Sequence, residues 1–290
     1  MSWQGGQRMG NGHRDGHGAV GRRAPQQAVS VPISSASASS GRVGAGVCIG
    51  VLGGFGLWVD GESAAVPAGS ERVLAFLALC ARAAVPRPLI AGTLWPASSE
   101  HSAHANLRSA LARLHHAGRQ ALEIGPAEVR LARDTTVDLH DARRTAHRIL
   151  DPADSGRPPC SSALDAVDVL SADLLPGWYD DWALLEAEDW RQLRLHALET
   201  LAGRLITARR YAEAVAAAQA AVHADPLRES GQACLVRAHL AEGNPSEALH
   251  AFARYTRRLH DELGLEPTER IQRLVAGLVR SRRGDDRPGP

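Results

Sequence analysis

The chain has 290 residues, which is long enough for two ordinary domains that each bury a hydrophobic core. No apolar run approaches the roughly 18 residues of a membrane-spanning helix, so we expect a soluble, cytoplasmic protein without membrane contacts. The net charge of +1 neither favours nor excludes nucleic acid as a partner, because phosphate binding depends on local clusters of charge rather than on the total.

Both ends of the chain are expected to be disordered, over residues 1–46 and 284–290. The first segment consists almost entirely of small and polar residues, with hardly any large apolar side chain. Burial of so little apolar surface does not offset the entropy that a folded chain loses.

Order is expected from Val47, where apolar residues that favour strands alternate with glycine. Asp60-Gly61 is a hairpin turn signal, so a small antiparallel sheet is predicted up to Ala68. A helix with Ser70 as its N-cap follows, and its core face is predicted to hold Val73, Leu74, Leu77, Cys80 and Ala81.

Two further helices and a hairpin complete this first part. A short helix over 89–96 ends at Pro96, and a third begins near 99–102 and ends around Gly118. Two strands, 121–124 and 128–131, are predicted to turn at Gly125-Pro126. Sheet, three helices and a terminal hairpin in this order predict a winged helix-turn-helix, a small α+β domain, over residues 47–145.

The third helix has one apolar face and one basic face. Leu107, Leu111 and Leu114 share the face that must pack on the core, whereas Ser109 lies opposite, flanked by arginines. No acid occurs between 101 and 119, so the helix is a candidate for reading a major groove, although a merely solvated face remains the alternative. The candidate DNA-contacting residues are Arg108, Arg113, Ser109, Asn106, His104 and Arg119 here, with Arg72 of the first helix and Arg130 of the hairpin.

Residues 146–283 predict an all-helical, tetratricopeptide-like domain, which makes the whole chain mainly α. A long amphipathic helix is expected over 184–208, and beyond it similar residues recur with a period of 34. Leu201 then corresponds to Leu235 and Ala214 to Ala248, with small residues where paired helices cross. Before the long helix, Trp178, Tyr179 and Trp182 stand among acidic residues and are candidates for a partner-binding surface, with internal packing as the alternative.

The sequence offers no site for catalysis, a cofactor or a metal ion. No nucleophile elbow or metalloprotease motif occurs, and a chain without lysine cannot form the phosphate-binding loop of nucleotide-hydrolysing enzymes. Histidines 101, 104, 115 and 116 cluster, but no cysteine or carboxylate joins them as a metal ligand, and the four cysteines are widely spaced. We therefore do not expect an enzyme.

Two sets of segments resemble the Streptomyces antibiotic regulatory proteins. LWP, ANLRSALARLHHAG and VDL in the first part are similar to that family's DNA-binding domain. Residues 174–202 and 209–270 are similar to its bacterial transcriptional activation domain. One departure is Glu71, because relatives often carry basic residues at that point of the first helix, and Glu71 would oppose a phosphate contact of Arg72.

The resemblance implies a transcriptional activator that binds tandem promoter repeats in double-stranded DNA, usually as a homodimer, and contacts RNA polymerase. A biosynthetic cluster for a secondary metabolite is the kind of target it implies. The alternative, from another class of function, is a repeat-type interaction adaptor whose winged helix no longer binds DNA.

Overall fold

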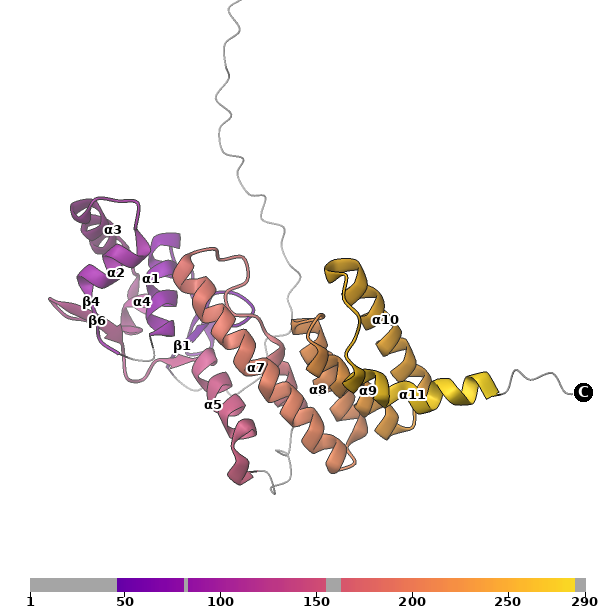
Figure 1. Ribbon diagram of the computed structural model, residues 1–290. Coiled ribbons are helices and arrows are strands. Elements are labelled where there is room, and N and C mark those ends of the chain that lie inside the picture. The colour runs from indigo at the N-terminus through magenta and orange to yellow at the C-terminus, as the bar shows by residue number, and fades with distance from the viewer. Residues whose placement is uncertain (1–45, 81–82, 155–162, 285–290) are drawn as a thin grey trace, which may run out of the picture. The chain divides into compact units, whose positions relative to one another are not determined.

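The computed structural model describes residues 46–80, 83–154 and 163–284 (Figure 1). The predicted tails lie outside the described residues, except for Gly46 and Gly284 at their inner ends. The chain is mainly helical, with its strands confined to the first half, as predicted. The predicted boundary between residues 145 and 146 falls inside one helix, α5 (Asp138–Leu150), so the division into domains stays a prediction.

The first sheet has four strands in the order β3-β2-β1-β7. β1 (Val47–Gly50) pairs with β2 (Gly56–Val59), which pairs with β3 (Glu62–Ser63) through the predicted turn at Asp60 and Gly61. Both turn residues have a positive φ, as a tight hairpin requires. On its other side β1 pairs in parallel with β7 (Thr136–Val137), a strand that sequence analysis missed because it is only two residues long.

Three helices follow the sheet: α1 (Ala68–Leu79), α2 (Arg87–Leu94) and α3 (Glu100–Ala112). The prediction of Ser70 as N-cap was wrong, because the N-cap of α1 is Pro67, three residues earlier. Ser70 is instead buried, and its hydroxyl donates a hydrogen bond of 2.7 Å to the carbonyl oxygen of Ala110 in α3. A buried hydroxyl needs such a partner, and this one ties α1 to α3.

The third helix is also shorter than predicted. Arg113 is its C-cap, and the chain becomes extended at His115 before a separate short helix, α4 (His116–Gln120). The break coincides with Leu114, whose side chain is buried in the core and packs close to Gly118. Helical periodicity alone did not reveal this interruption, since Leu114 fits the apolar face of either arrangement.

The wing is a three-stranded sheet in the order β4-β6-β5. β5 (Leu122–Ile124) and β6 (Glu128–Leu131) form the predicted hairpin, and β4 (Val85–Pro86) adds to β6. Arg87 fastens the tip of the hairpin, because its guanidinium donates to the carbonyl oxygen of Gly125 at 3.1 Å.

The second half is a series of helices. After α5 come a short 3-10 turn, η1 (Pro152–Asp154), then α6 (Ala163–Ser171), the long α7 (Asp181–Thr207), α8 (Tyr211–Ala224), α9 (Glu229–Glu242), α10 (Pro245–Leu263) and α11 (Glu269–Gly284). Consecutive helices from α7 to α10 pack on each other, and alanines of α8 and α10 are fully buried at the crossings, as the repeat predicts. Gly243 and Gly264 end α9 and α10 in the left-handed conformation.

An aromatic cluster joins the winged helix to the helical half. Phe76 of α1 meets the ring of Trp182 edge to face, with 5.4 Å between centroids, and Trp182 meets Trp178 in the same way at 5.9 Å. Phe55 lies against Trp178 at 6.4 Å. Such contacts stabilise beyond the apolar area that they bury, so the two halves share a packed junction.

Candidate nucleic-acid interface

Helix α3 is held by an apolar face and presents a polar one. Leu107, Ala110 and Leu111 are buried, as the periodicity predicted, and Ala103 is buried beside them. At its start, the hydroxyl oxygen of Ser99 accepts a hydrogen bond from the backbone N–H of Ser102 at 3.3 Å. The fixed core face determines which side chains of α3 point into solvent.

The exposed side of α3 and of the following turn is basic. Asn106, Arg108, Ser109 and Arg113 are all exposed, and Arg119 is exposed on α4. Within the part of the chain that the structure describes, Arg108, Arg113 and Arg119 form no ion pair. Exposed guanidinium groups of this kind can bind phosphates or guanine edges, so these three arginines stay candidates for DNA contacts.

His104 lies differently from the other candidates on α3. Its side chain is half-buried, and its Nε2 atom is buried without a hydrogen-bond partner among the described residues. It therefore borders the core rather than the open face. The neighbouring Glu100 lies in the first turn of α3, just before the window without acids, and favours the positive end of the helix dipole.

Arg72 and Arg130 are engaged by carboxylates of the chain itself. Arg72 donates to Asp180 at 2.5 Å, which links α1 to the start of α7. Arg130 donates through two nitrogens to Glu123 on the facing strand, at 2.7 and 2.5 Å. A guanidinium held in this way is less available to a phosphate than a free one, so the two arginines differ in kind from those of α3.

Glu71 does not pair with Arg72. Its carboxyl is partly buried, and this burial raises its pKa above the ordinary value. No local pattern around Arg72 indicated that its partner is Asp180, more than a hundred residues away.

The three candidates for partner binding also separate. Trp178 and Trp182 belong to the aromatic cluster at the junction and are half-buried, whereas Tyr179 between them is 82% exposed. Internal packing, the alternative left open, therefore describes the two tryptophans. Tyr179 remains the exposed aromatic of this loop.

No helix among the described residues is long and apolar enough to cross a membrane. Among the same residues, no group of three or more histidine, cysteine or acidic side chains is placed to hold a metal ion.

The helical half of the chain is similar to a known domain family. Residues 137–278 match the bacterial transcriptional activator domain. The regulatory protein AfsR of Streptomyces coelicolor is 32% identical over 242 residues, which are 80% of this chain but 24% of AfsR. The regulatory protein DnrI of Streptomyces peucetius is 27% identical over 236 residues, which are 76% of this chain and 87% of DnrI.

A solved structure shares the fold. EmbR of Mycobacterium tuberculosis, in complex with a low-affinity phosphopeptide, superposes with a TM-score of 0.56 at 22% identity, over 81% of this chain and 65% of EmbR. The chain thus spans about a quarter of AfsR but most of DnrI. A winged helix followed by tetratricopeptide-like helices, the activator-domain match and the similarity to both regulators show that the chain belongs to the Streptomyces antibiotic regulatory protein family.

Proposed function

We propose that the chain is a DNA-binding transcriptional activator in which α3 reads the major groove of promoter DNA. The observation that carries the proposal is that Arg108 and Arg113 are exposed and form no ion pair with a described residue. They flank the small Ser109 on the side of α3 opposite its buried leucines. Long arginines beside small residues let a helix axis approach the groove while the guanidinium groups reach base edges or phosphates.

We further propose that the protein acts together with a second copy of itself and with RNA polymerase. By analogy with its relatives, the protein binds tandem repeats in a promoter as a homodimer, in the cytoplasm where the chromosome lies. The helical half, residues 137–278, then contacts RNA polymerase, and the controlled genes belong to a cluster for a secondary metabolite. The names of two similar proteins, AfsR and DnrI, support a regulatory role.

The test measures, by gel shift over a range of salt concentrations, how tightly the protein binds the DNA upstream of its own gene. Removing Arg108 and Arg113 together is expected to weaken binding and to lower the salt slope by up to about 2, since each phosphate contact contributes about 0.9. The matched control is Arg148→Ala with Arg209→Ala, which removes the same charge from two exposed arginines that form no ion pair with a described residue.

Equal losses in both double variants would mean that net charge, not α3, determines binding. If the unaltered chain leaves no footprint at moderate salt but still captures protein partners, the adaptor function is favoured instead. The ion pairs of Arg72 and Arg130 with carboxylates of the chain itself would then support a winged helix that no longer binds DNA.

A further inference from the structure

The first turns of α7 carry a stripe of exposed leucines and acids. We call Asp181, Leu184, Leu185, Glu188 and Asp189 the leucine–acid stripe; their spacing of three and four residues places them on one helix face. Leu184 is 47% exposed and Leu185 is 71% exposed. Two adjacent exposed leucines of a helix whose opposite face is buried mark a surface that another molecule covers.

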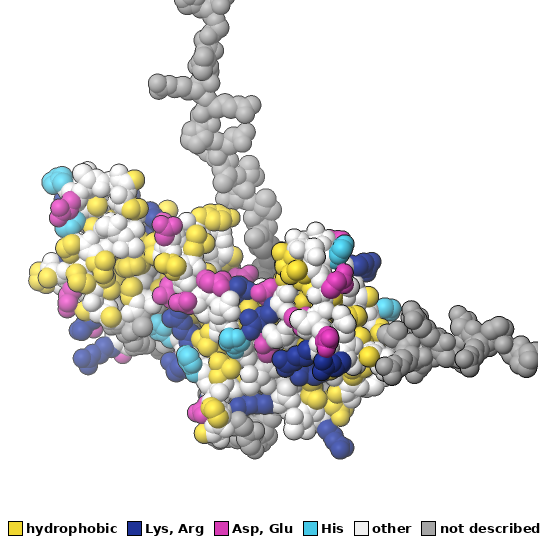
Figure 2. Space-filling model, viewed as in Figure 1, with side chains coloured by type: hydrophobic (Ala, Val, Ile, Leu, Met, Phe, Trp, Pro, Cys, Tyr) yellow, Lys and Arg dark blue, Asp and Glu magenta, His cyan; other side chains and the backbone are white. Residues whose placement is uncertain are grey.

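The charge of the stripe is largely uncompensated. Glu188 pairs with Arg191 at 2.8 Å, but Asp181 and Asp189 form no ion pair with any described residue. Figure 2 shows acidic side chains around the first half of α7 and a cluster of arginines over the helices that follow it. A partner for the stripe needs an apolar floor and a basic rim.

Such a surface exists elsewhere on the same chain. A groove of about 420 Å³ lies among α8, α9 and α10, with Val222, Leu235 and Ala251 as its apolar floor. The volume accommodates more than one leucine side chain. We call this site the arginine groove, after Arg254, Arg257 and Arg258 of α10, which line it together with Gln232, Tyr255, Asp261 and Glu262.

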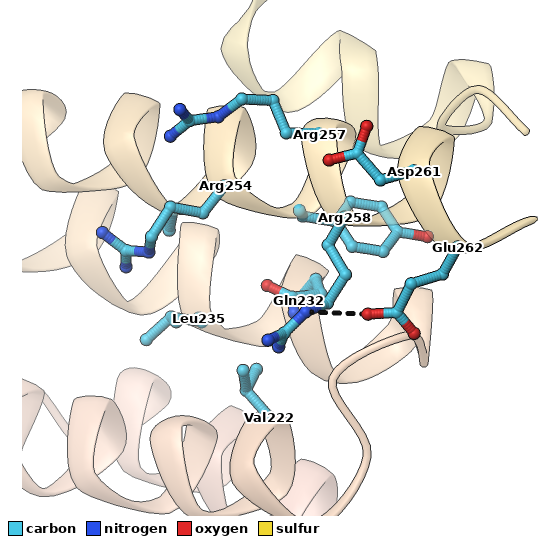
Figure 3. Close-up of a pocket in the computed structure, with 10 residues that line it drawn as sticks. Val222, Gln232, Leu235, Arg254, Arg257, Arg258, Asp261 and Glu262 are labelled. Carbon is cyan, nitrogen blue, oxygen red and sulfur yellow. Dashed lines mark ion pairs between the residues drawn. The ribbon is translucent and has the colours of Figure 1, made fainter. Parts of the chain in front are cut away.

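The charges of the arginine groove are unevenly distributed. Arg258 pairs with Glu262 at 3.2 Å, whereas Arg254 and Arg257 form no ion pair with a described side chain. Figure 3 shows these two arginines pointing away from Asp261 and Glu262. One end of the groove is therefore basic and open beside the apolar floor.

We infer that the leucine–acid stripe of one copy docks into the arginine groove of a second copy of this chain. Leu184 and Leu185 would cover the apolar floor, and Asp181 and Asp189 would face Arg254 and Arg257. The stripe and the groove both carry apolar area, their unpaired charges are opposite, and no described part of the chain covers either surface.

The contact joins two different surfaces, so it is heterologous and head to tail. Such a contact relates successive copies by the same step in one direction, whereas a two-fold contact relates two copies by a rotation of 180°. It therefore matches DNA sites repeated in tandem rather than palindromic ones, a corollary that rests on the proposed function. In solution the same contact allows growth beyond a dimer as concentration rises.

The test uses the full chain in sedimentation velocity without DNA, with one variant for each surface. Leu185→Arg places a positive charge on the stripe, and Arg254→Glu reverses a charge of the groove; both positions are exposed, so folding is expected to persist and is checked by circular dichroism. Each variant alone is expected to raise the dissociation constant at least about tenfold. Leu265→Arg, at a leucine that is 55% exposed outside both surfaces, is the matched control and should associate normally.

Mixing the two variants distinguishes the arrangement. The stripe variant keeps an intact groove and the groove variant keeps an intact stripe, so the mixture should form a 1:1 dimer and nothing larger. An unaltered chain that stays monomeric, a single variant that associates normally, or a mixture that fails to recover the dimer would each overturn the inference. The affinity for a single DNA site should be equal in all variants. If no variant and not even the unaltered chain binds DNA, the proposed function is refuted while the association in solution still stands.

Discussion

The ion pair between Arg72 and Asp180 separates two roles for Arg72, a phosphate contact and an intramolecular tie. The atoms are 2.5 Å apart, and the side chains are 31% and 30% exposed. Two charges about 4 Å apart attract with about 1 kcal/mol in water and about 4 kcal/mol near a protein surface, and solvent access at a third of each side chain moves the value toward the lower figure. We therefore expect a coupling of about 1 kcal/mol.

The measurement is a double-mutant cycle with Arg72→Ala, Asp180→Ala and the double variant, followed by urea unfolding. In a domain of this size, about 1 kcal/mol corresponds to a shift of about 2–4 °C in Tm. The salt slope of DNA binding should be unchanged in Arg72→Ala, because a paired arginine releases few counterions. A coupling near zero together with a slope lowered by about 1 would refute this reasoning and return Arg72 to the DNA interface.

Three further changes test the packing that supports the site. Leu111→Ala, in the buried face of α3, should cost about 2–5 kcal/mol of unfolding free energy and weaken DNA binding at 37 °C, whereas the exposed Ala112→Ser should do neither. Gly264→Ala, at a φ of 66°, should cost about 1 kcal/mol by thermal unfolding, and no loss would mean that the turn relaxes. Burial raises the pKa of Asp138, so the folded state holds this proton more tightly than the unfolded state; relative to Asp138→Asn, the unaltered protein should lose stability as pH rises above the ordinary aspartate pKa of about 4, and a constant difference in urea midpoints would contradict the assignment.

Most of the fold was predictable from local patterns. The turn at Asp60-Gly61, the hairpin at Gly125-Pro126 and the crossings of the alanine-rich helices all depend on residues close in sequence or on a repeat period. The buried face of α3 followed from leucine spacing, and so did the exposure of Arg108 and Arg113 on the other side.

Interactions between distant residues were not predictable. Serine is a common N-cap residue, but the hydroxyl of Ser70 donates a hydrogen bond to the carbonyl oxygen of Ala110, forty residues away. Arg72 has the sequence context of an exposed arginine, and its pairing with Asp180 becomes apparent only in the folded structure. A single sequence carries no record of such pairs, because each partner is equally compatible with a solvated surface.

The parallel pairing of β7 with β1 has a consequence for how the two halves can be separated. The strand comes after the wing in sequence, yet it completes the sheet at the chain's beginning, and the carboxylate of Asp138 next to it accepts hydrogen bonds from the backbone of Val51 and Leu52 at 2.9 and 3.0 Å. A fragment that ends at the wing would expose the edge of β1 and leave these N–H groups without their acceptor. Gene fusions and expression fragments that cut at residue 137, where the activator-domain match starts, therefore divide a sheet.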